Sequence, residues 1–165
     1  YWTADGEAIL YSLDDLVSMY YRSVGRNANL LLNANPGPDG LVPDADMRRY
    51  EAFGREIRRR FQSPIAETEN QTGDIVTLTL EKPTRINQVV IMEDIASTGE
   101  QILEYRLEGA RGEDDWQVLC EGQSIGHKRI QQFDSKELTN VRLRILKAKA
   151  SPCAIRHLSV YDCDG

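Results

Sequence analysis

Two pairs of aspartates are the first residues in this sequence that could carry acid–base chemistry. Asp14 is next to Asp15, and Asp44 is two residues before Asp46. Paired carboxyl groups can act as a general acid and a general base when their surroundings separate their pKa values. Both pairs, however, fall in the expected first turn of an amphipathic helix, where negative charge faces the positive end of the helix dipole. We therefore predict that this chain contributes no catalytic residue.

The Asp44–Asp46 spacing also bears on metal binding, because calcium prefers carboxylate oxygens. A single pair is a weak signal, so a structural calcium ion stays unassigned and we expect no other cofactor. His157 has no acidic or histidine partner at ligand spacing, and we predict no metal site there.

A second group of candidates lies in the C-terminal half, where Trp116 precedes the run His127, Lys128 and Arg129. Tryptophan can stack on the C–H face of a sugar ring, while imidazole and cationic groups donate hydrogen bonds to hydroxyl groups. The same residues fit a structural role, because Trp116 opens the strand-like run WQVLC and a strand exposes alternate residues. We favour the structural role and keep glycan binding as the alternative.

Three cysteines, Cys120, Cys153 and Cys163, leave two arrangements open. Their spacing does not match a zinc site. One disulfide with one free thiol is compatible with an exported protein. Three buried thiols are the alternative that we favour, because free cysteine commonly packs as a small apolar core residue.

The N-terminal part predicts a helix, a strand and a second helix. Ser12 and Asp15 have the spacing of a capping box, so the first helix begins there, and Gly25 is placed to end it. Its apolar stripe consists of Leu13, Leu16, Val17, Tyr20 and Val24. Residues 28–32 are too short for a helix and contain three consecutive leucines, which is typical of a parallel strand covered on both faces. After the loop PGPDG, Asp44 is expected to cap the second helix, with the stripe Met47, Tyr50, Phe53, Ile57 and Phe61.

Charge argues against nucleic acid and membrane surfaces as partners. The second helix carries six arginines, but residues 1–61 have a net charge of −1 and the whole chain has −6. The aromatic residues of this helix belong to its apolar stripe and the arginines lie largely off that stripe, so the two do not alternate along one surface as a stacking groove requires. We interpret them as a solvated helix face.

From Asp74 onward the apolar pattern changes to a period of two, which predicts strands. The expected strands cover 75–80, 86–92, 102–107, 116–120, 125–133, 141–146 and 155–161, with turn signals such as KPT at 82–84 between them. Such short, evenly spaced strands predict an antiparallel β-sandwich of jelly-roll type. The resulting division is an α/β fragment at 1–62, a polar linker at 63–73 and a sandwich at 74–165.

The order of Trp2, the run LVSMYYRSVGRNANLLLN, the loop PGPDGLVPDAD and a helix through FGREI resembles the closing part of the catalytic barrel in α-L-fucosidases of glycoside hydrolase family 29. The resemblance implies an α+β chain in which the end of a (β/α)8 barrel precedes the β-sandwich. The sandwich itself resembles galactose-binding-like modules of the discoidin, or coagulation factor 5/8 type C, class. A non-catalytic carbohydrate-binding or structural module is the alternative.

The same resemblance implies several functional assignments. The substrate would be a terminal α-L-fucose on a glycan, and the catalytic Asp and Glu would lie N-terminal to Tyr1. Trp2 resembles an aromatic residue that packs on the fucose ring, with a core or interface position as the alternative. Asn33 would lie at the active face of the barrel, but we favour a structural role in which it bonds the loop PGPDG. The apolar stripes would be covered by the rest of the barrel, by the sandwich or by a neighbouring chain. Relatives of bacterial origin are often exported, which favours a periplasmic or secreted protein.

Overall fold

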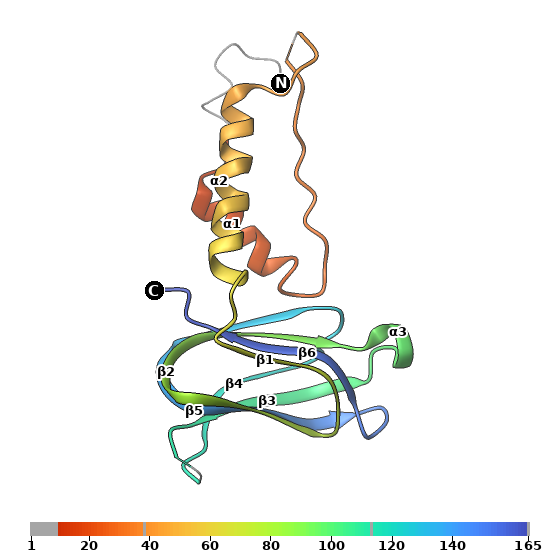
Figure 1. Ribbon diagram of the computed structural model, residues 1–165. Helices are drawn as coiled ribbons and strands as arrows, with labels where there is room; N and C mark the ends of the chain where they lie inside the picture. The colour runs from red at the N-terminus through yellow and green to blue at the C-terminus, as the bar shows by residue number, and fades with distance from the viewer. Residues whose placement is uncertain (1–9, 38, 113, 165) are drawn as a thin grey trace.

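The computed structural model describes residues 10–37, 39–112 and 114–164, and places a helical part on one end of a β-sandwich (Figure 1). The helices are α1 (Leu13–Arg22), α2 (Asp44–Phe61) and α3 (Ile95–Thr98). The strands are β1 (Ala66–Thr72), β2 (Ile75–Glu93), β3 (Ile102–Ala110), β4 (Gln117–Gly122), β5 (Arg129–Ala148) and β6 (Ala154–Tyr161). Among the described residues, no helix combines the length and the apolar character of a bilayer span.

The six strands form one antiparallel sheet in the order β1-β6-β2-β5-β3-β4. β2 and β5 are long enough to take part in both layers, so the sheet folds over itself. The end of β2 pairs with β6 and the start of β5, whereas the start of β2 pairs with the end of β5, which continues to β3. The predicted antiparallel sandwich is therefore confirmed. The turn predicted at 82–84 is wrong, because β2 continues through a register shift between Thr79 and Thr84.

Most of the predicted linker is a strand. Residues 66–72 form β1, which pairs with β6 in register from Ala66 opposite Val160 to Thr72 opposite Ala154. The segment AETENQT lacks apolar alternation because β1 is an edge strand and most of its side chains are exposed. Its place in the sheet depends on backbone hydrogen bonds, which side-chain patterns do not report.

Two apolar cores hold the molecule together. The larger lies between the layers of the sandwich and includes Ile86, Tyr105, Leu143 and Leu158, all fully buried. The smaller core joins the sandwich to the helices. It consists of Val90, Ile130, Tyr161 and Cys163, with Tyr20, Tyr21, Phe61 and Met92 packed against them. Residues 86–91 of β2 are therefore covered on both faces. All three cysteines are free thiols; Cys153 and Cys163 are buried as favoured, whereas Cys120 is half-buried.

The capping box of α1 is confirmed, but the end of this helix differs from the prediction. The Ser12 hydroxyl accepts a hydrogen bond from the Asp15 N–H at 3.0 Å, and the Asp15 carboxylate accepts one from the Ser12 N–H at 3.3 Å. The helix ends at Arg22 with Ser23 as its C-cap, so Gly25 is not the cap. Gly25 is needed instead for close packing, because a Cβ there would lie 2.6 Å from the Tyr21 carbonyl oxygen.

The triple leucine is extended but is not a strand in this structure, which corrects the prediction for residues 28–32. No other strand lies beside it among the described residues, and an extended segment becomes a strand only by sharing backbone hydrogen bonds with a neighbour. Leu31 is 88% exposed. The segment runs back along α2, where the Tyr50 hydroxyl donates to the Asn33 carbonyl at 2.7 Å (Figure 1).

The second helix also begins differently from the prediction. Pro43 occupies the N-cap position and Asp44 is the first helical residue, so Asp44 supports the helix dipole without capping a backbone N–H. Of its stripe, Phe53 and Phe61 pack on the Tyr20 ring with centroid distances of 6.3 and 5.5 Å. Met47, at the other end of the helix, is 46% exposed.

Candidate functional site

The connection that follows α1 docks on the first residues of β5. The Gly25 carbonyl accepts a hydrogen bond from the Ile130 N–H at 3.0 Å, and the Asn27 N–H donates to the Lys128 carbonyl at 3.0 Å. Arg26 lies between them and forms an antiparallel bridge with Arg129. These three residues, Gly25, Arg26 and Asn27, are termed the junction clamp. They attach the helical part to the sandwich through its backbone.

Asn27 adds side-chain contacts to two sandwich loops. Its backbone has φ +66°, a left-handed conformation that asparagine tolerates better than most residues. Its side-chain oxygen accepts from the His127 N–H at 2.6 Å, and its amide donates to the Glu100 carboxylate at 2.9 Å. Gly126 leaves room for this side chain, since a Cβ there would overlap it. Asn27 thus contributes a tertiary contact that the sequence around it did not predict.

Beneath the clamp, the carboxylate of Glu93 is 2% exposed and accepts three backbone hydrogen bonds. The donors are the N–H groups of Gln101 at 2.9 Å, Ile102 at 3.0 Å and Gly126 at 2.7 Å. One side chain therefore fixes the two loops that receive Asn27. Sequence reasoning missed Glu93, because a charged residue at a strand end is usually solvated.

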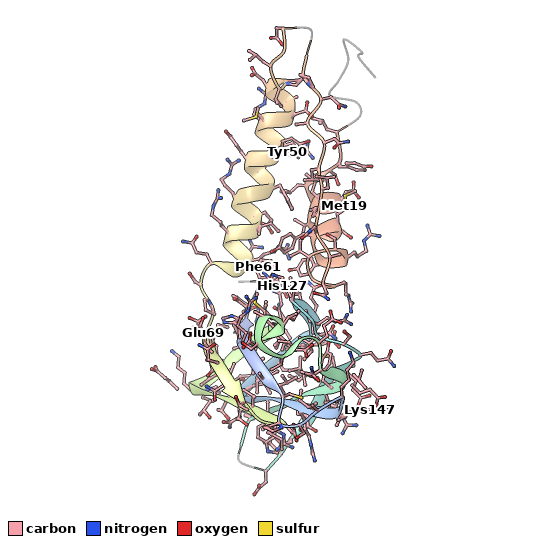
Figure 2. The ribbon with its side chains drawn as sticks, turned by 90° about the vertical axis from the view of Figure 1, so that its right-hand side faces the viewer. Met19, Tyr50, Phe61, Glu69, His127 and Lys147 are labelled. Carbon is pink, nitrogen blue, oxygen red and sulfur yellow. The ribbon has the colours of Figure 1, made fainter. Side chains whose placement is uncertain are left out.

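The cation predicted at Lys128 is placed against aromatic rings. Its ammonium nitrogen lies 3.4 Å from the Tyr20 hydroxyl and 5.6 Å from the centre of the Phe61 ring. Burial lowers the pKa of Lys128. A cation over aromatic faces links the sandwich to both helices. His127 is exposed and lies in a turn at the same end of the sandwich, not in the strand expected at 125–133 (Figure 2).

The other predicted glycan-binding residues are not assembled with these. Trp116 stacks on the guanidinium of Arg142 at 3.9 Å from the ring centre, and Arg142 bonds the buried Glu108 carboxylate at 2.5 Å. Arg142 lies in the C-terminal half of β5, whereas His127 precedes the first residue of this strand. Arg129 is half-buried, and its Nε has no hydrogen-bond partner among the described residues. Trp2 lies outside the described residues.

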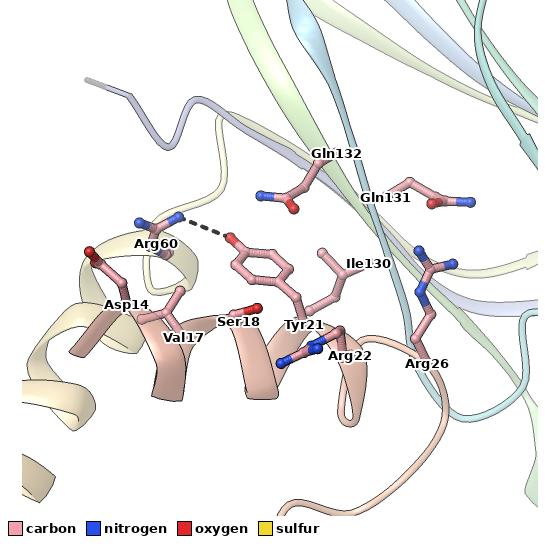
Figure 3. Close-up of a pocket in the computed structure, with 10 residues that line it drawn as sticks. All are labelled: Asp14, Val17, Ser18, Tyr21, Arg22, Arg26, Arg60, Ile130, Gln131 and Gln132. Carbon is pink, nitrogen blue, oxygen red and sulfur yellow. Dashed lines mark hydrogen bonds between the residues drawn. The ribbon is translucent and has the colours of Figure 1, made fainter. Parts of the chain in front are cut away.

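A cleft of about 520 Å³ opens beside the clamp, between α1 and β5; we term it the junction cleft (Figure 3). Its α1 wall consists of Asp14, Val17, Ser18, Tyr21 and Arg22. Arg26, Arg60 and the strand residues Ile130, Gln131 and Gln132 complete it. The Tyr21 hydroxyl lies at its centre, donates to the Gln88 carboxamide oxygen at 2.6 Å and accepts from Arg60 at 3.2 Å. Burial raises the pKa of Tyr21, so this hydroxyl stays protonated at neutral pH.

The last turn of α2 supplies an ion-pair cluster behind the cleft. Glu56 receives Arg59 at 2.9 Å and Arg60 at 2.7 Å, and Arg59 also donates to the Cys163 carbonyl at 3.2 Å. Hydrogen bonds from Arg59 and Arg60 lower the pKa of Glu56 from 4.5 to about 2. The prediction of a solvated arginine face holds for Arg59, which is exposed, but not for Arg60, which is half-buried and bonds to α1. Both arginines still make tertiary or helix contacts, and Arg59 ties α2 to the C-terminal end of the described chain.

The Glu56 cluster predicts a defined pH dependence. Because the pKa is lower in the folded state, the stabilisation is complete above about pH 4.5 and is lost as the pH falls towards 2. We expect Glu56→Gln to lower the free energy of unfolding by about 1 kcal/mol at pH 7, and we expect this difference from wild type to vanish near pH 2. Thermal unfolding from pH 2 to 7 measures it. Glu51→Gln, which alters an exposed pair at 3.8 Å, serves as the matched control, and parallel curves for wild type and Glu56→Gln would contradict the assignment.

Comparison with known proteins gives one consistent group of relatives. No family model matches the chain. α-L-Fucosidase 1 of Arabidopsis thaliana is 25% identical over 181 residues, which cover 88% of this chain and 35% of that protein. A crystallised protein of Bacteroides thetaiotaomicron, assigned to the α-L-fucosidases, is 40% identical with a TM-score of 0.92, covering 98% of this chain and 36% of that one.

A fucosidase of glycoside hydrolase family 29 from Ruminococcus gnavus, solved in complex with fucose, is 25% identical with a TM-score of 0.81 and covers 92% of this chain and 37% of that one. The chain spans about a third of the length of the curated relatives it matches. Its homologues and structural neighbours are thus α-L-fucosidases, and it matches their C-terminal part.

Proposed function

We propose that this chain is the C-terminal part of a retaining α-L-fucosidase of family 29, in which residues 1–62 close the catalytic barrel and residues beyond them form the sandwich. The substrate is a glycan with terminal α-L-fucose. The nucleophilic aspartate and the acid/base glutamate lie N-terminal to Tyr1. The 40% identity to the Bacteroides thetaiotaomicron protein, together with the unpartnered leucine segment, carries this proposal.

The leucine segment supports the barrel assignment physically. Residues 28–33 are extended, connect two helices, and leave Leu31 88% exposed. A helix–extended–helix order is the repeating unit of a (β/α)8 barrel, whose strands are covered on both faces. An exposed leucine on an unpaired extended segment fits a strand that pairs with barrel strands contributed by another part of the protein.

The carboxylates of this chain support an upstream catalytic pair. Retaining glycosidases need two carboxyl groups about 5 to 5.5 Å apart around the scissile bond. Asp15 is held in its capping box, while Asp44 and Asp46 lie in the first turn of α2. Within the described residues, Asp14 is the sole carboxylate that lines the junction cleft. Export from the cell and a galactose-binding-like role of the sandwich stay predictions.

Hydrolysis of an aryl α-L-fucoside tests the proposal. The protein that carries this chain together with its upstream barrel is expected to release the aryl group and to give the α-anomer of fucose first, as NMR can follow. The 165-residue chain alone is expected to be inactive, and an aryl β-D-galactoside serves as the control substrate. An inactive protein with an intact upstream barrel would contradict the proposal.

The junction clamp favours a structural role for the sandwich beside this activity. Arg26 and Asn27 directly precede the leucine segment, and both are bound by the start of β5 and its preceding loop. The sandwich thereby fixes where the proposed last barrel strand begins. A lectin-like role has less support, since one face of Trp116 is covered by Arg142.

A further inference from the structure

The junction cleft concentrates positive charge that the chain does not neutralise. Arg22 and Arg26 are exposed, line the cleft, and have no hydrogen-bond or ion-pair partner among the described side chains. Arg60 differs, because Glu56 and the Tyr21 hydroxyl occupy its donors. Among the described residues that line the cleft, the one carboxylate is Asp14, at the far end of α1 from Arg22. Two guanidinium groups are therefore available in a chain whose net charge is −6.

The wall opposite α1 carries the two glutamines of β5, Gln131 and Gln132 (Figure 3). Gln132 is exposed, whereas Gln131 is buried and its amide donates to the Tyr105 hydroxyl at 2.6 Å. A carboxamide binds hydroxyl groups as donor and acceptor, so Gln132 is available to a ligand in the cleft. The volume of about 520 Å³ falls within the range of small-ligand sites, about 300 to 1,000 Å³.

We propose that the junction cleft binds an anionic saccharide, with the carboxylate or sulfate ester of the sugar held by Arg22 and Arg26 and a hydroxyl group by Gln132. Guanidinium groups suit both anions because they donate two parallel hydrogen bonds. The saccharide part of this inference rests on the proposed function, whereas the anion part rests on the cleft alone. The fucosidase would thereby recognise an acidic sugar at a distance from the fucose.

Titration of the protein that carries this chain tests the inference. The probes are galacturonate, galactose 6-sulfate, galactose and sodium sulfate, followed by calorimetry at low ionic strength. We expect one or both anionic sugars to bind at least tenfold more tightly than galactose, and the preference to fall as salt rises. Comparison of galacturonate with galactose 6-sulfate separates carboxylate from sulfate ester. Equal affinity for galactose, or no binding of either anionic sugar, would overturn the proposal; binding of sodium sulfate alone would overturn its saccharide part.

Four substitutions locate the binding. Arg22→Gln and Arg26→Gln are each expected to weaken anion binding by roughly tenfold, because each removes charge-assisted hydrogen bonds. Asp14→Asn is expected to strengthen it about twofold by removing like charge from the wall. Arg55→Gln makes the same charge change on an exposed part of α2 and serves as the matched control. An equal loss in Arg55→Gln, or no effect of any cleft variant, would place the anion elsewhere.

Turnover of the aryl α-L-fucoside is measured on the same preparations. Anion binding without turnover would contradict the proposed function and leave the cleft assignment intact. Turnover without anion binding would support the proposed function and contradict the cleft assignment. The unfolding temperature of each variant shows whether its fold is retained. Asp14→Asn is expected to strengthen anion binding, and a gain in affinity cannot be explained by loss of the fold.

Discussion

Replacement of Glu93 by alanine is expected to destabilise the sandwich by about 3 to 5 kcal/mol, which approaches the whole stability of many domains. The variant would leave three backbone N–H groups without an acceptor, those of Gln101, Ile102 and Gly126. Two of these bonds are buried, so water cannot easily replace the carboxylate. Urea unfolding followed by circular dichroism measures the loss.

Glu93→Gln provides a graded comparison, because a carboxamide oxygen can retain some of these bonds while its NH2 group faces donors. We expect it to lie between wild type and Glu93→Ala. Glu104→Ala removes an exposed carboxylate on β3 that lies 3.9 Å from Lys147, and is expected to cost less than about 0.5 kcal/mol. A Glu93→Ala variant as stable as Glu104→Ala would show that the loops do not depend on this carboxylate.

The parts of the fold that the sequence predicts well are those with strong local signals. The Ser12–Asp15 capping box and the stripe of α1 involve residues within a few turns of one another, so neighbours in sequence determine them. Alternation along Val76, Leu78 and Leu80 likewise reports one buried face of β2. These patterns predict elements without any knowledge of tertiary contacts.

The errors arise where distant residues decide the structure. The leucine segment has strand propensity but no neighbouring strand among the described residues, and β1 has a neighbour but no apolar pattern. Residues 82–84 carry turn residues, yet the pairing of β2 with β5 carries the strand through them. Backbone pairing is non-local, which is why composition and periodicity do not predict it.

The candidate site is predicted only in part, again because residues distant in sequence decide its contacts. His127, Lys128 and Arg129 do lie at the junction, but their contacts come from α1, α2 and the clamp, which are all far from them in sequence. Trp116 was grouped with them by residue type alone, and the fold places it on Arg142. Glu93 and Asn27 carry no sequence signal, because each acts through hydrogen bonds to loops of the sandwich that no local pattern specifies.

Asn27 offers the second large effect, and a pair of substitutions divides it into two causes. Asn27→Gly keeps the positive φ but removes the bonds to His127 and Glu100, so we expect a loss of about 1 to 2 kcal/mol. Asn27→Ala removes the same bonds and also places a Cβ in the left-handed region, which adds about 1 kcal/mol. Chemical denaturation of both variants measures the difference.

Hydrogen exchange then shows where the loss is felt. If the clamp couples the two parts, Asn27→Ala should increase exchange both at the start of β5 and in the last turn of α1, while β3 and β4 stay protected. Asn70→Ala is the matched control, since Asn70 also has a positive φ, of 53°, but lies in the edge strand β1. For Asn70→Ala we expect faster hydrogen exchange in β1 alone. Uniform loosening by both variants would mean that Asn27 contributes only backbone conformation, and that the sandwich does not hold the segment leading into the proposed barrel strand.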